Sequence, residues 1–316
     1  MSKFIFGPVN SRRLGRSLGV DIVPKKTCNL NCVYCEVGPT TTKGMARDFY
    51  VSWEELKPEF SEVLQKKRFD VVTITGMGEP TLNKNLQSIV RGIKSLTGKP
   101  LVLLTNSLLL TEPGVRQEVL DFSIISPSLD AVLPEDFERI DRPVIPITPQ
   151  DIIEGLAALR KEFSGKIWLE VLLAQNYNHT PQAIEALQDA VKRIQPDKVH
   201  LNSVGRPPLT AMKEKFADCV QPLTMEQLQA IQQKLGDCAE IIASKAQVIT
   251  QKQQTGDLPD NVMQYLKRRP ADQEEIAQGL NIPSQEIGAI LAKLYQNNHI
   301  QKKIHEQKVV FFTDVG

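Results

Sequence analysis

The sequence lacks an excess of charge, a long apolar run and an even number of cysteines. Its 316 residues carry 38 Lys and Arg against 37 Asp and Glu, for a formal net charge of +1. A protein that grips long nucleic acid by bulk electrostatics is normally more basic. No apolar run approaches the roughly 20 residues of a membrane-spanning helix, and the apolar stretch within residues 1–8 is too short for a signal-peptide core. We therefore expect a cytoplasmic globular protein without a membrane segment.

Short apolar runs alternate with helical stretches from about residue 18 to residue 203. The runs lie at residues 18–24, 70–76, 100–106, 122–128, 166–174 and 197–203. Several are apolar nearly throughout, which is typical of parallel strands covered on both faces. Helix-capping residues stand before the intervening stretches, as in Thr148-Pro149 and Thr180-Pro181, and Ser52 with Glu55 predicts a capping box. Six strand–helix units predict an α/β fold, a parallel sheet curled into a partial barrel with reactive groups after its strands.

Beyond residue 205 the pattern of the sequence changes twice. Residues 206–256 form a connecting region between the barrel and the C-terminal domain. This region contains a helix capped by Thr224 and Gln227 and a Gln-rich linker at residues 247–256. Residues 257–316 predict three helices, at 260–269, after Asp272 and at 284–296, and then two strands at 299–304 and 308–313. This order resembles a winged helix-turn-helix. We predict three parts: the barrel at 1–205, a connecting helix and linker at 206–256, and a small C-terminal winged helix-turn-helix domain at 257–316.

Three of the five cysteines, Cys28, Cys32 and Cys35, lie within eight residues after the first predicted strand. An odd total argues against a closed disulfide framework, and in a reducing compartment such a cluster is typical of a metal site. The C-x3-C-x2-C spacing supplies soft ligands suited to an iron–sulfur cluster or to zinc. Structural zinc would need a fourth ligand from far along the chain, whereas three thiolates on a cubane leave one iron open. Cys219 and Cys238 are interpreted as buried free thiols.

Turns rich in glycine and polar residues follow the next three predicted strands. They read Gly76-Met77-Gly78-Glu79-Pro80, Thr105-Asn106-Ser107 and Ser126-Pro127-Ser128-Leu129-Asp130. Glycine lets the backbone approach a ligand closely, and a carboxylate can accept hydrogen bonds from an ammonium group. Each turn also has an ordinary interpretation, in which its residues satisfy their own backbone.

Together these residues resemble the radical S-adenosylmethionine (SAM) superfamily, whose hallmark is C-x3-C-x-aromatic-C after the first strand of a TIM-like (β/α)6 partial barrel. The resemblance covers about residues 10 to 205. It implies an enzyme with two cofactors, a [4Fe–4S] cluster held by the three cysteines and S-adenosyl-L-methionine. The implied SAM contacts are Tyr34 at the adenine, Gly76, Met77, Gly78 and Glu79 at the amino group, Asn106, and Ser128 and Asp130 at the ribose. Met77 departs from the family's glycine at its position.

The resemblance also implies the reaction. One electron from the reduced cluster would break the sulfur–C5′ bond of SAM, giving methionine and a 5′-deoxyadenosyl radical that abstracts a hydrogen atom from the substrate. The electron would come from a one-electron donor such as flavodoxin or ferredoxin. For the unknown substrate we favour a macromolecule, such as tRNA or a protein, over a small molecule.

A closer resemblance rests on residues 10–19, Asp141-Arg142-Pro143 and Arg206-Pro207-Pro208. These segments resemble uncharacterised iron–sulfur oxidoreductases distantly related to the wyosine tRNA-base enzymes. Within the first segment, Arg12, Arg13 and Arg16 could hold an anionic substrate or form salt bridges that seal the edge of the barrel. We favour the salt bridges. A tRNA substrate is only weakly supported by this resemblance, because a neutral chain offers no broad phosphate-binding surface.

Two further features bear on function. Glu170, His200 and Asn202 stand among apolar neighbours on the fifth and sixth predicted strands, and buried polar groups need partners. In the C-terminal domain, seven basic residues face eight acidic ones, and the helix at 284–296 offers only Lys293 against Glu286. A recognition helix in the major groove normally presents more basic or amide side chains. We therefore interpret this domain as a protein-docking or substrate-presenting module.

The competing hypothesis for the whole chain is a metal- or redox-sensing regulator. In that hypothesis the cysteine triad senses and the winged helix binds nucleic acid. The predicted six-strand barrel argues against it, because a sensor needs no pocket of that size.

Overall fold

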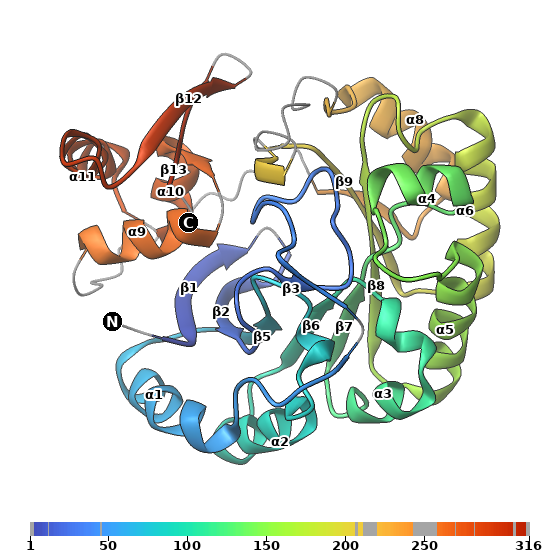
Figure 1. The fold of residues 1–316 in the computed structure, drawn as a ribbon, viewed down its shortest axis with the longest axis horizontal. Helices are drawn as coiled ribbons and strands as arrows, with labels where there is room; N and C mark the ends of the chain where they lie inside the picture. The colour runs from blue at the N-terminus through green and yellow to red at the C-terminus, as the bar shows by residue number, and fades with distance from the viewer. Residues whose placement is uncertain are drawn as a thin grey trace.

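The computed structural model describes residues 3–11, 13–44, 46–205, 208–210, 220–242, 258–268, 270–280, 282–305 and 308–313. Arg12, Arg206, Pro207, Cys219 and the predicted linker at 247–256 lie outside these ranges. An eight-stranded sheet with strand order β1-β2-β5-β6-β7-β8-β9-β10 forms the centre of the molecule (Figure 1). A separate pair, β3 (Thr27–Cys28) and β4 (Thr42–Lys43), lies in the loop after β2.

The six central strands confirm the prediction from the sequence. They are β2 (Gly15–Asp21), β5 (Val71–Thr75), β6 (Leu101–Thr105), β7 (Ile124–Pro127), β8 (Lys166–Leu173) and β9 (Lys198–Ser203), and neighbours run parallel. Two edge strands were not predicted: β1 (Ile5–Ser11), antiparallel to β2, and β10 (Ala239–Ile241), parallel to β9. In β1 the register shifts between Phe6 and Val9, around Gly7 and Pro8. Glycine and proline are depleted inside strands, so Gly7 and Pro8 make β1 hard to predict from the sequence.

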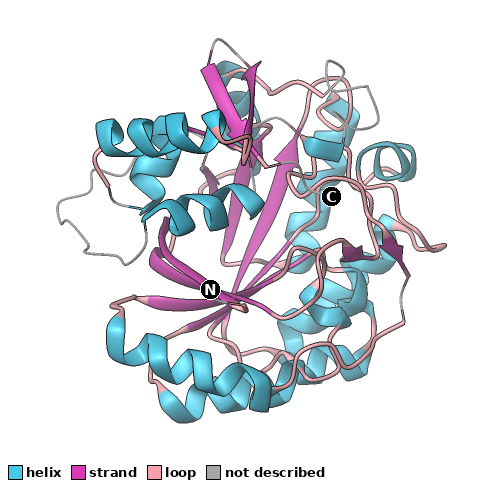
Figure 2. Ribbon diagram, turned by 60° about the vertical axis from the view of Figure 1, so that its left-hand side comes forward, coloured by secondary structure: helices cyan, strands magenta, loops and turns pink. Residues whose placement is uncertain are grey.

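Helices surround the sheet on its outer side (Figures 1 and 2). They are α1 (Trp53–Lys66), α2 (Leu86–Leu96), α3 (Pro113–Glu118), α4 (Pro134–Ile140), α5 (Pro149–Glu162), α6 (Pro181–Ile194) and α8 (Met225–Leu235), with 3-10 turns η1 (Pro80–Leu82) and η2 (Leu108–Thr111). The predicted capping boxes at Ser52 and Thr224 form, and Thr148 makes a third with Asp151. Within the described ranges, no helix combines the length and hydropathy that a bilayer-spanning segment needs.

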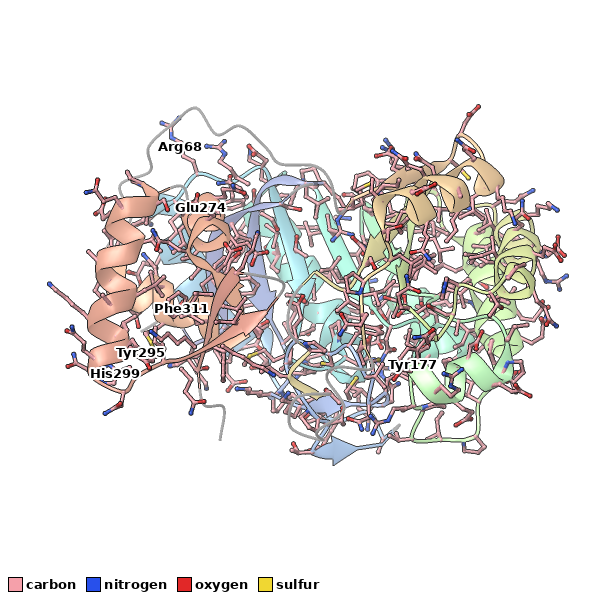
Figure 3. All side chains as sticks on the ribbon, turned by 90° about the horizontal axis from the view of Figure 1, so that it is seen from above. Arg68, Tyr177, Glu274, Tyr295, His299 and Phe311 are labelled. Atoms are coloured by element: carbon pink, nitrogen blue, oxygen red, sulfur yellow. The ribbon has the colours of Figure 1, made fainter. Side chains whose placement is uncertain are left out.

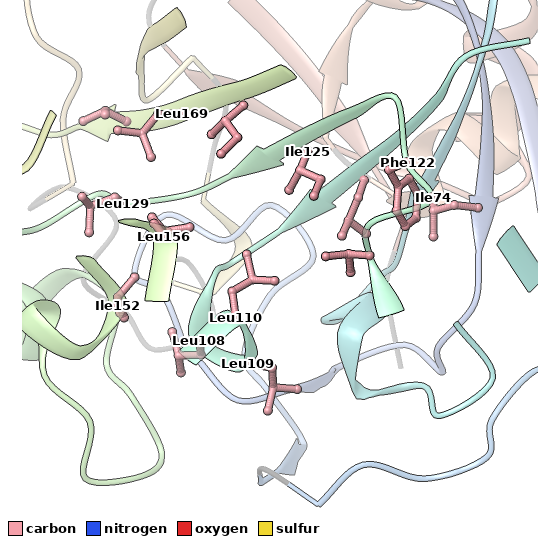
Figure 4. Packing of buried hydrophobic residues seen from close by; sticks show 14 of the residues in the cluster. Ile74, Leu108, Leu109, Leu110, Phe122, Ile125, Leu129, Ile152, Leu156 and Leu169 are labelled. Carbon is pink, nitrogen blue, oxygen red and sulfur yellow. The ribbon is translucent and has the colours of Figure 1, made fainter. Parts of the chain in front are cut away.

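The barrel core lies between the sheet and these helices. Leu108, Leu109 and Leu110 of η2 lie near Ile152 and Leu156 of α5, and all five side chains are buried (Figure 4). Burial of such side chains contributes about 1.5–3 kcal/mol each relative to exposure. This packing closes the outer face of the sheet, so functional groups are left to its inner face and its carboxyl edge.

The inner face of the sheet carries polar side chains. Along β8 the side chains alternate between fully buried and partly exposed, and the buried ones belong to the core under the helices. The alternate set includes Trp168 and Glu170. On the opposite side of the barrel, the hydroxyls of Ser17 and Thr73 hydrogen-bond at 2.6 Å. The curled sheet therefore encloses a polar interior.

A second, smaller core belongs to the C-terminal elements, here called the C-terminal module. They are α9 (Leu258–Arg268), β11 (Ala271–Asp272), α10 (Gln273–Leu280), α11 (Ser284–Gln296), β12 (Gln301–His305) and β13 (Lys308–Phe312), with sheet order β11-β13-β12. The predicted helices and hairpin are present, and their assignment to the winged-helix class stays a prediction. The module covers edge strand β1, where Val9 packs on its core and Asn10 Nδ2 donates to the Gln278 carbonyl at 2.9 Å.

Candidate functional site

The three clustered cysteines lie on the loop that follows β2, at the carboxyl edge of the sheet. Cys28 ends β3, and all three thiols are half-buried. Backbone hydrogen bonds fix the loop: Asn31 N and Val33 N donate to carbonyls of the 140–142 segment, and Cys35 N donates to the Cys32 carbonyl at 3.1 Å. The Thr40 hydroxyl closes the loop onto the Leu30 carbonyl at 2.6 Å. The structure thus holds the predicted ligands together on one braced loop.

Burial raises the pKa of two of these thiols. It raises the pKa of Cys28 to about 12, with a further contribution from the Glu79 carboxylate. It also raises the pKa of Cys32 well above the usual value, and the Asp141 carboxyl adds to this. The three thiols lie near enough that Cys35 raises the pKa of both others. A bound metal would displace these protons, since the thiolate is the ligand.

The donor set fits an iron–sulfur cluster. Within the described ranges, no three His, Cys, Asp or Glu side chains converge on a single metal ion. A cubane cluster does not require such convergence, because its thiolates bind different irons. The three sulfurs of one loop therefore match the group that the motif predicts.

The turn after β5 packs directly on the cysteine loop. Glu79 N donates to the Thr27 carbonyl at 2.9 Å, and Lys26 N donates to the Met77 carbonyl at 2.8 Å. A Cβ at Gly78 would collide with that same Thr27 carbonyl, so only glycine fits there. Met77 contributes its carbonyl, so the replacement of the family's glycine by methionine leaves this contact intact.

Glu79 is buried, and both oxygens of its carboxylate accept hydrogen bonds from neighbouring residues. Its Oε1 accepts from the Thr81 hydroxyl at 2.6 Å, the Thr81 N at 3.1 Å and the Thr105 hydroxyl at 2.7 Å, and its Oε2 accepts from Asn106 N at 2.8 Å. Desolvation raises the pKa of this carboxyl, and the same hydrogen bonds oppose the rise. Glu79 thus ties the end of β5 to the end of β6.

Four of the predicted SAM contacts line one cavity beside the cysteines. Its lining consists of Leu30, Tyr34, Asn106, Ser128, Leu129, Asp130, Ala131, Phe137, Asp141 and Ile152. Asn106 Nδ2 donates to Cys28 Sγ at 3.6 Å, and Cys32 Sγ donates to Asp141 Oδ1 at 3.7 Å, so the cavity adjoins both sulfurs. Gly76, Met77, Gly78 and Glu79 are not part of this lining. Their turn contacts the cysteine loop through Met77, Gly78 and Glu79.

Two buried carboxyls, Asp130 and Asp141, form the polar wall of this cavity. The Tyr34 hydroxyl donates to Asp130 Oδ2, and Leu172 N donates to Asp130 Oδ1 at 2.7 Å. Burial raises the pKa of Asp130 to about 6 and also raises that of Asp141 well above its usual value, and the carboxyls are hydrogen-bonded to each other. In the sequence, Asp141 stands out only as part of Asp141-Arg142-Pro143; its place against Cys32 follows from the fold.

The polar side chains on β8 and β9 lie next to one another inside the barrel. Glu170 accepts from Ser126 Oγ at 2.9 Å and from Asn202 Nδ2 at 3.0 Å, and His200 Nδ1 lies 4.0 Å from it. Arg13 forms an ion pair with the same carboxylate. None of these side chains lines the cavity described above.

Both described members of the arginine segment form salt bridges, as predicted, but the pair made by Arg13 lies inside the barrel and not at its edge. Arg13 pairs with Glu170, and Arg16 binds Asp70 through two nitrogens, at 3.1 and 2.8 Å. Cys238 is half-buried and its thiol contacts the Leu235 carbonyl at 3.6 Å.

The chain belongs to the radical SAM superfamily. The family model described as the radical SAM superfamily matches residues 22–187. This span contains the cysteine loop, the turn after β5 and all the residues that line the cavity. The superfamily uses a [4Fe–4S] cluster and S-adenosylmethionine, and its members are enzymes.

Similar proteins define the relationship further. A protein named "GTPase Obg" from Brachyspira hyodysenteriae is 32% identical over 310 residues, covering 96% of this chain and 44% of that protein. A UPF0026 protein from Synechocystis is 36% identical over 204 residues, 64% of this chain and 76% of that protein. The chain thus spans less than half of the Brachyspira relative. The hypothesis of a metal-sensing regulator gains no support from these relatives.

A solved structure shares the fold. A radical SAM methyltransferase from Sphaerobacter thermophilus superposes with a TM-score of 0.52, covering 71% of this chain and 66% of its own, at 16% identity. At this identity the similarity concerns the fold, a parallel sheet consistent with the predicted partial barrel.

Proposed function

We propose that the protein is a radical SAM enzyme that cleaves S-adenosylmethionine reductively and abstracts a hydrogen atom from a substrate. The observation that carries this proposal is the junction between the cysteine loop and the cavity. Tyr34 comes from the loop itself, Asn106 contacts Cys28, and Asp141 contacts Cys32, and all three line the cavity. A ligand in the cavity would therefore adjoin the group that the sulfurs hold.

Each residue has a proposed role that its contacts support. Cys28, Cys32 and Cys35 would hold the cluster, which supplies the one-electron cleavage of SAM when bound. Tyr34, Asn106, Ser128 and Asp130, which line the cavity, would contact SAM bound beside the sulfurs. Glu79 would act on the ammonium group through the turn that it braces, because its own oxygens are already bound by Thr81, Thr105 and Asn106 N. The surrounding protein would exclude water and oxygen from the reacting groups.

We propose a macromolecular substrate, a protein or tRNA, and a docking role for the C-terminal module. The module exposes large apolar side chains, Tyr295, Ile304 and Val309, and such surfaces often meet other proteins. The resemblance of residues 10–19 to the wyosine group favours tRNA, but Arg13 and Arg16 are engaged in ion pairs, so this rests on the resemblance alone.

The remaining assignments are part of the same proposal. The barrel would comprise residues 1–205, the connection 206–256 and a winged helix-turn-helix 257–316. A flavodoxin or ferredoxin would supply the electron. A reducing cytoplasm would suit thiols that must stay free for a cluster.

The direct test is anaerobic reconstitution with iron and sulfide, followed by reduction in the presence of SAM. We expect four irons per chain and the formation of 5′-deoxyadenosine, measured by chromatography. A tightly bound zinc ion with a fourth side-chain ligand, and no 5′-deoxyadenosine, would contradict the proposal. Titration of the full chain with tRNA at rising salt then addresses the substrate class, because phosphate contacts weaken steeply with salt.

A further inference from the structure

The side-chain amide of Asn106 reaches the cysteine loop from the end of β6. Its Nδ2 donates to Cys28 Sγ at 3.6 Å, and the two residues are 78 positions apart in the chain. A thiol sulfur is a weak acceptor, whereas a thiolate, the form that binds a metal, accepts hydrogen bonds more strongly. This contact therefore becomes stronger when Cys28 acts as a ligand.

The orientation of the Asn106 amide is fixed by a backbone group. Leu108 N donates to Asn106 Oδ1 at 3.2 Å. A backbone N–H can only donate, so the amide oxygen faces Leu108 and the NH2 group faces the cysteine loop. The NH2 group also donates to Asn29 Oδ1 at 2.6 Å. Its two hydrogens thus serve Asn29 and Cys28, while Oδ1 keeps a second lone pair for a ligand in the cavity.

The backbone around Asn106 is held by its neighbours. Asn106 N donates to Glu79 Oε2 at 2.8 Å, and Ser107 N donates to the Thr105 hydroxyl at 3.3 Å. Ser107 is fully buried with a φ of +75°, and its hydroxyl donates to the Ser128 carbonyl at 2.6 Å. These contacts hold the amide in place beside Cys28. In such poorly solvated surroundings a hydrogen bond is stronger than in water.

A donor to the sulfur of Cys28 acts on the cluster that this sulfur would hold. Reduction adds one electron to the cluster, and part of the added negative charge lies on the coordinating sulfurs. An N–H group that points at such a sulfur stabilises the reduced form more than the oxidised form. Hydrogen bonds to the sulfurs are among the features that set cluster potentials.

We propose that Asn106 raises the reduction potential of the cluster by donating its amide N–H to Cys28 Sγ. This inference rests on the proposed function, in which the three cysteines hold the cluster. In the step concerned, one electron passes from a one-electron donor to the cluster, with no proton transferred and no bond broken. Asn106 is thus a positioning residue for charge, in addition to its place in the cavity wall.

The test is an EPR-monitored redox titration of the reconstituted full chain without SAM, with Asn106→Ser compared with wild type. Serine keeps an acceptor for Leu108 N but is too short to reach the sulfur. At the wild-type midpoint potential, we expect the ratio of reduced to oxidised cluster to fall about fivefold, the size expected for one lost hydrogen bond. This is equivalent to about 40 mV for a one-electron couple.

Asn202→Ser is the matched control, because it makes the same chemical change on β9. Asn202 Nδ2 donates to Glu170 at 3.0 Å, and the residue does not line the cavity. We expect the ratio in this variant to stay within about twofold of wild type. A role of Asn106 in bracing alone would lower the unfolding temperature of Asn106→Ser and leave the potential unchanged.

The outcomes separate the two proposals. A wild-type chain that assembles no cluster would refute the proposed function. A wild-type cluster whose potential is unchanged in Asn106→Ser, changed equally in Asn202→Ser, or changed only when SAM is added would overturn the role of Asn106 alone. If Asn106→Ser does not retain its iron, the same titration on Asn106→Leu decides. Loss of iron from both folded variants would also overturn this role, because a residue that only adjusts the potential is not needed for assembly.

Discussion

The barrel buries acidic side chains, whereas the C-terminal module exposes apolar ones. In the barrel, the acidic groups Glu79, Asp130 and Asp141 are buried around the cysteine loop. In the module, the large apolar side chains of Tyr295, Ile304 and Val309 are exposed. The described part of the barrel region is much larger and exposes the same number of large apolar side chains. Tyr295, His299 and Phe311 lie at the module's end of the molecule, far from Tyr177 on the barrel (Figure 3).

This contrast indicates a division of labour. Buried, hydrogen-bonded acids are costly, and they are typical of sites where chemistry is tuned. Exposed apolar side chains on a small folded unit are typical of a surface that meets a partner. The barrel and the module also have separate hydrophobic cores. Substitutions can therefore impair one region and leave the other intact.

The largest expected effect concerns the barrel. Cys32→Ala should reduce 5′-deoxyadenosine formation below detection while the far-UV circular dichroism spectrum is unchanged, because it removes one of three ligands and only a small buried group. Cys238→Ala is the matched control, a half-buried thiol on another part of the barrel, and should keep activity. Full cleavage activity in Cys32→Ala would show that the ligand assignment is wrong.

The next effect concerns the core of the module. Leu291 on α11 is 1% exposed, and Leu291→Ala should lower the free energy of unfolding of the module by about 3 kcal/mol. Chemical denaturation should then show an early transition for the module, and SAM cleavage should persist below it. Leu96→Ala, on a side chain 39% exposed, should leave the profile unchanged. A single shifted transition with parallel loss of cleavage would contradict the independence of the two cores.

A smaller effect is expected from the buried acid that braces the site. Glu79→Gln places an amide NH2 against groups that themselves donate hydrogen bonds, and should cost about 2 kcal/mol of barrel stability in urea unfolding. Glu62→Gln, at an exposed ion pair with Lys66, should not change the unfolding curve. Equal behaviour of the two variants would refute a bracing role for Glu79.

The smallest effect concerns the edge of the barrel. The Arg16 guanidinium lowers the pKa of Asp70 to about 2, and both side chains are more than one-third exposed, so Asp70→Asn should cost less than about 1 kcal/mol. Because the folded-state pKa is lowered, the wild-type advantage is complete above about pH 3.8 and is lost as pH falls toward about 2. Urea unfolding of both proteins across this range measures it, and an advantage that grows on acidification would contradict the assignment.

Local patterns predicted much of the fold. The six central strands and the capping boxes at Ser52 and Thr224 depend on neighbours in the chain, so the sequence predicts them. Strand β1 escaped prediction because Gly7 and Pro8 interrupt its pattern. The partner of β1, the C-terminal module, lies more than 250 residues away, so no local signal marks that contact.

The candidate site also combines features set by local sequence with contacts that only the fold creates. The spacing of Cys28, Cys32 and Cys35 by itself determined that a soft metal group could be held on one loop, because ligand type and spacing are local properties. Only the tertiary structure decided that Asp141 lies against Cys32 and that Arg13 and Glu170 meet inside the barrel. These pairs join strands and loops far apart in the chain, and their burial exists only once the sheet has curled around them.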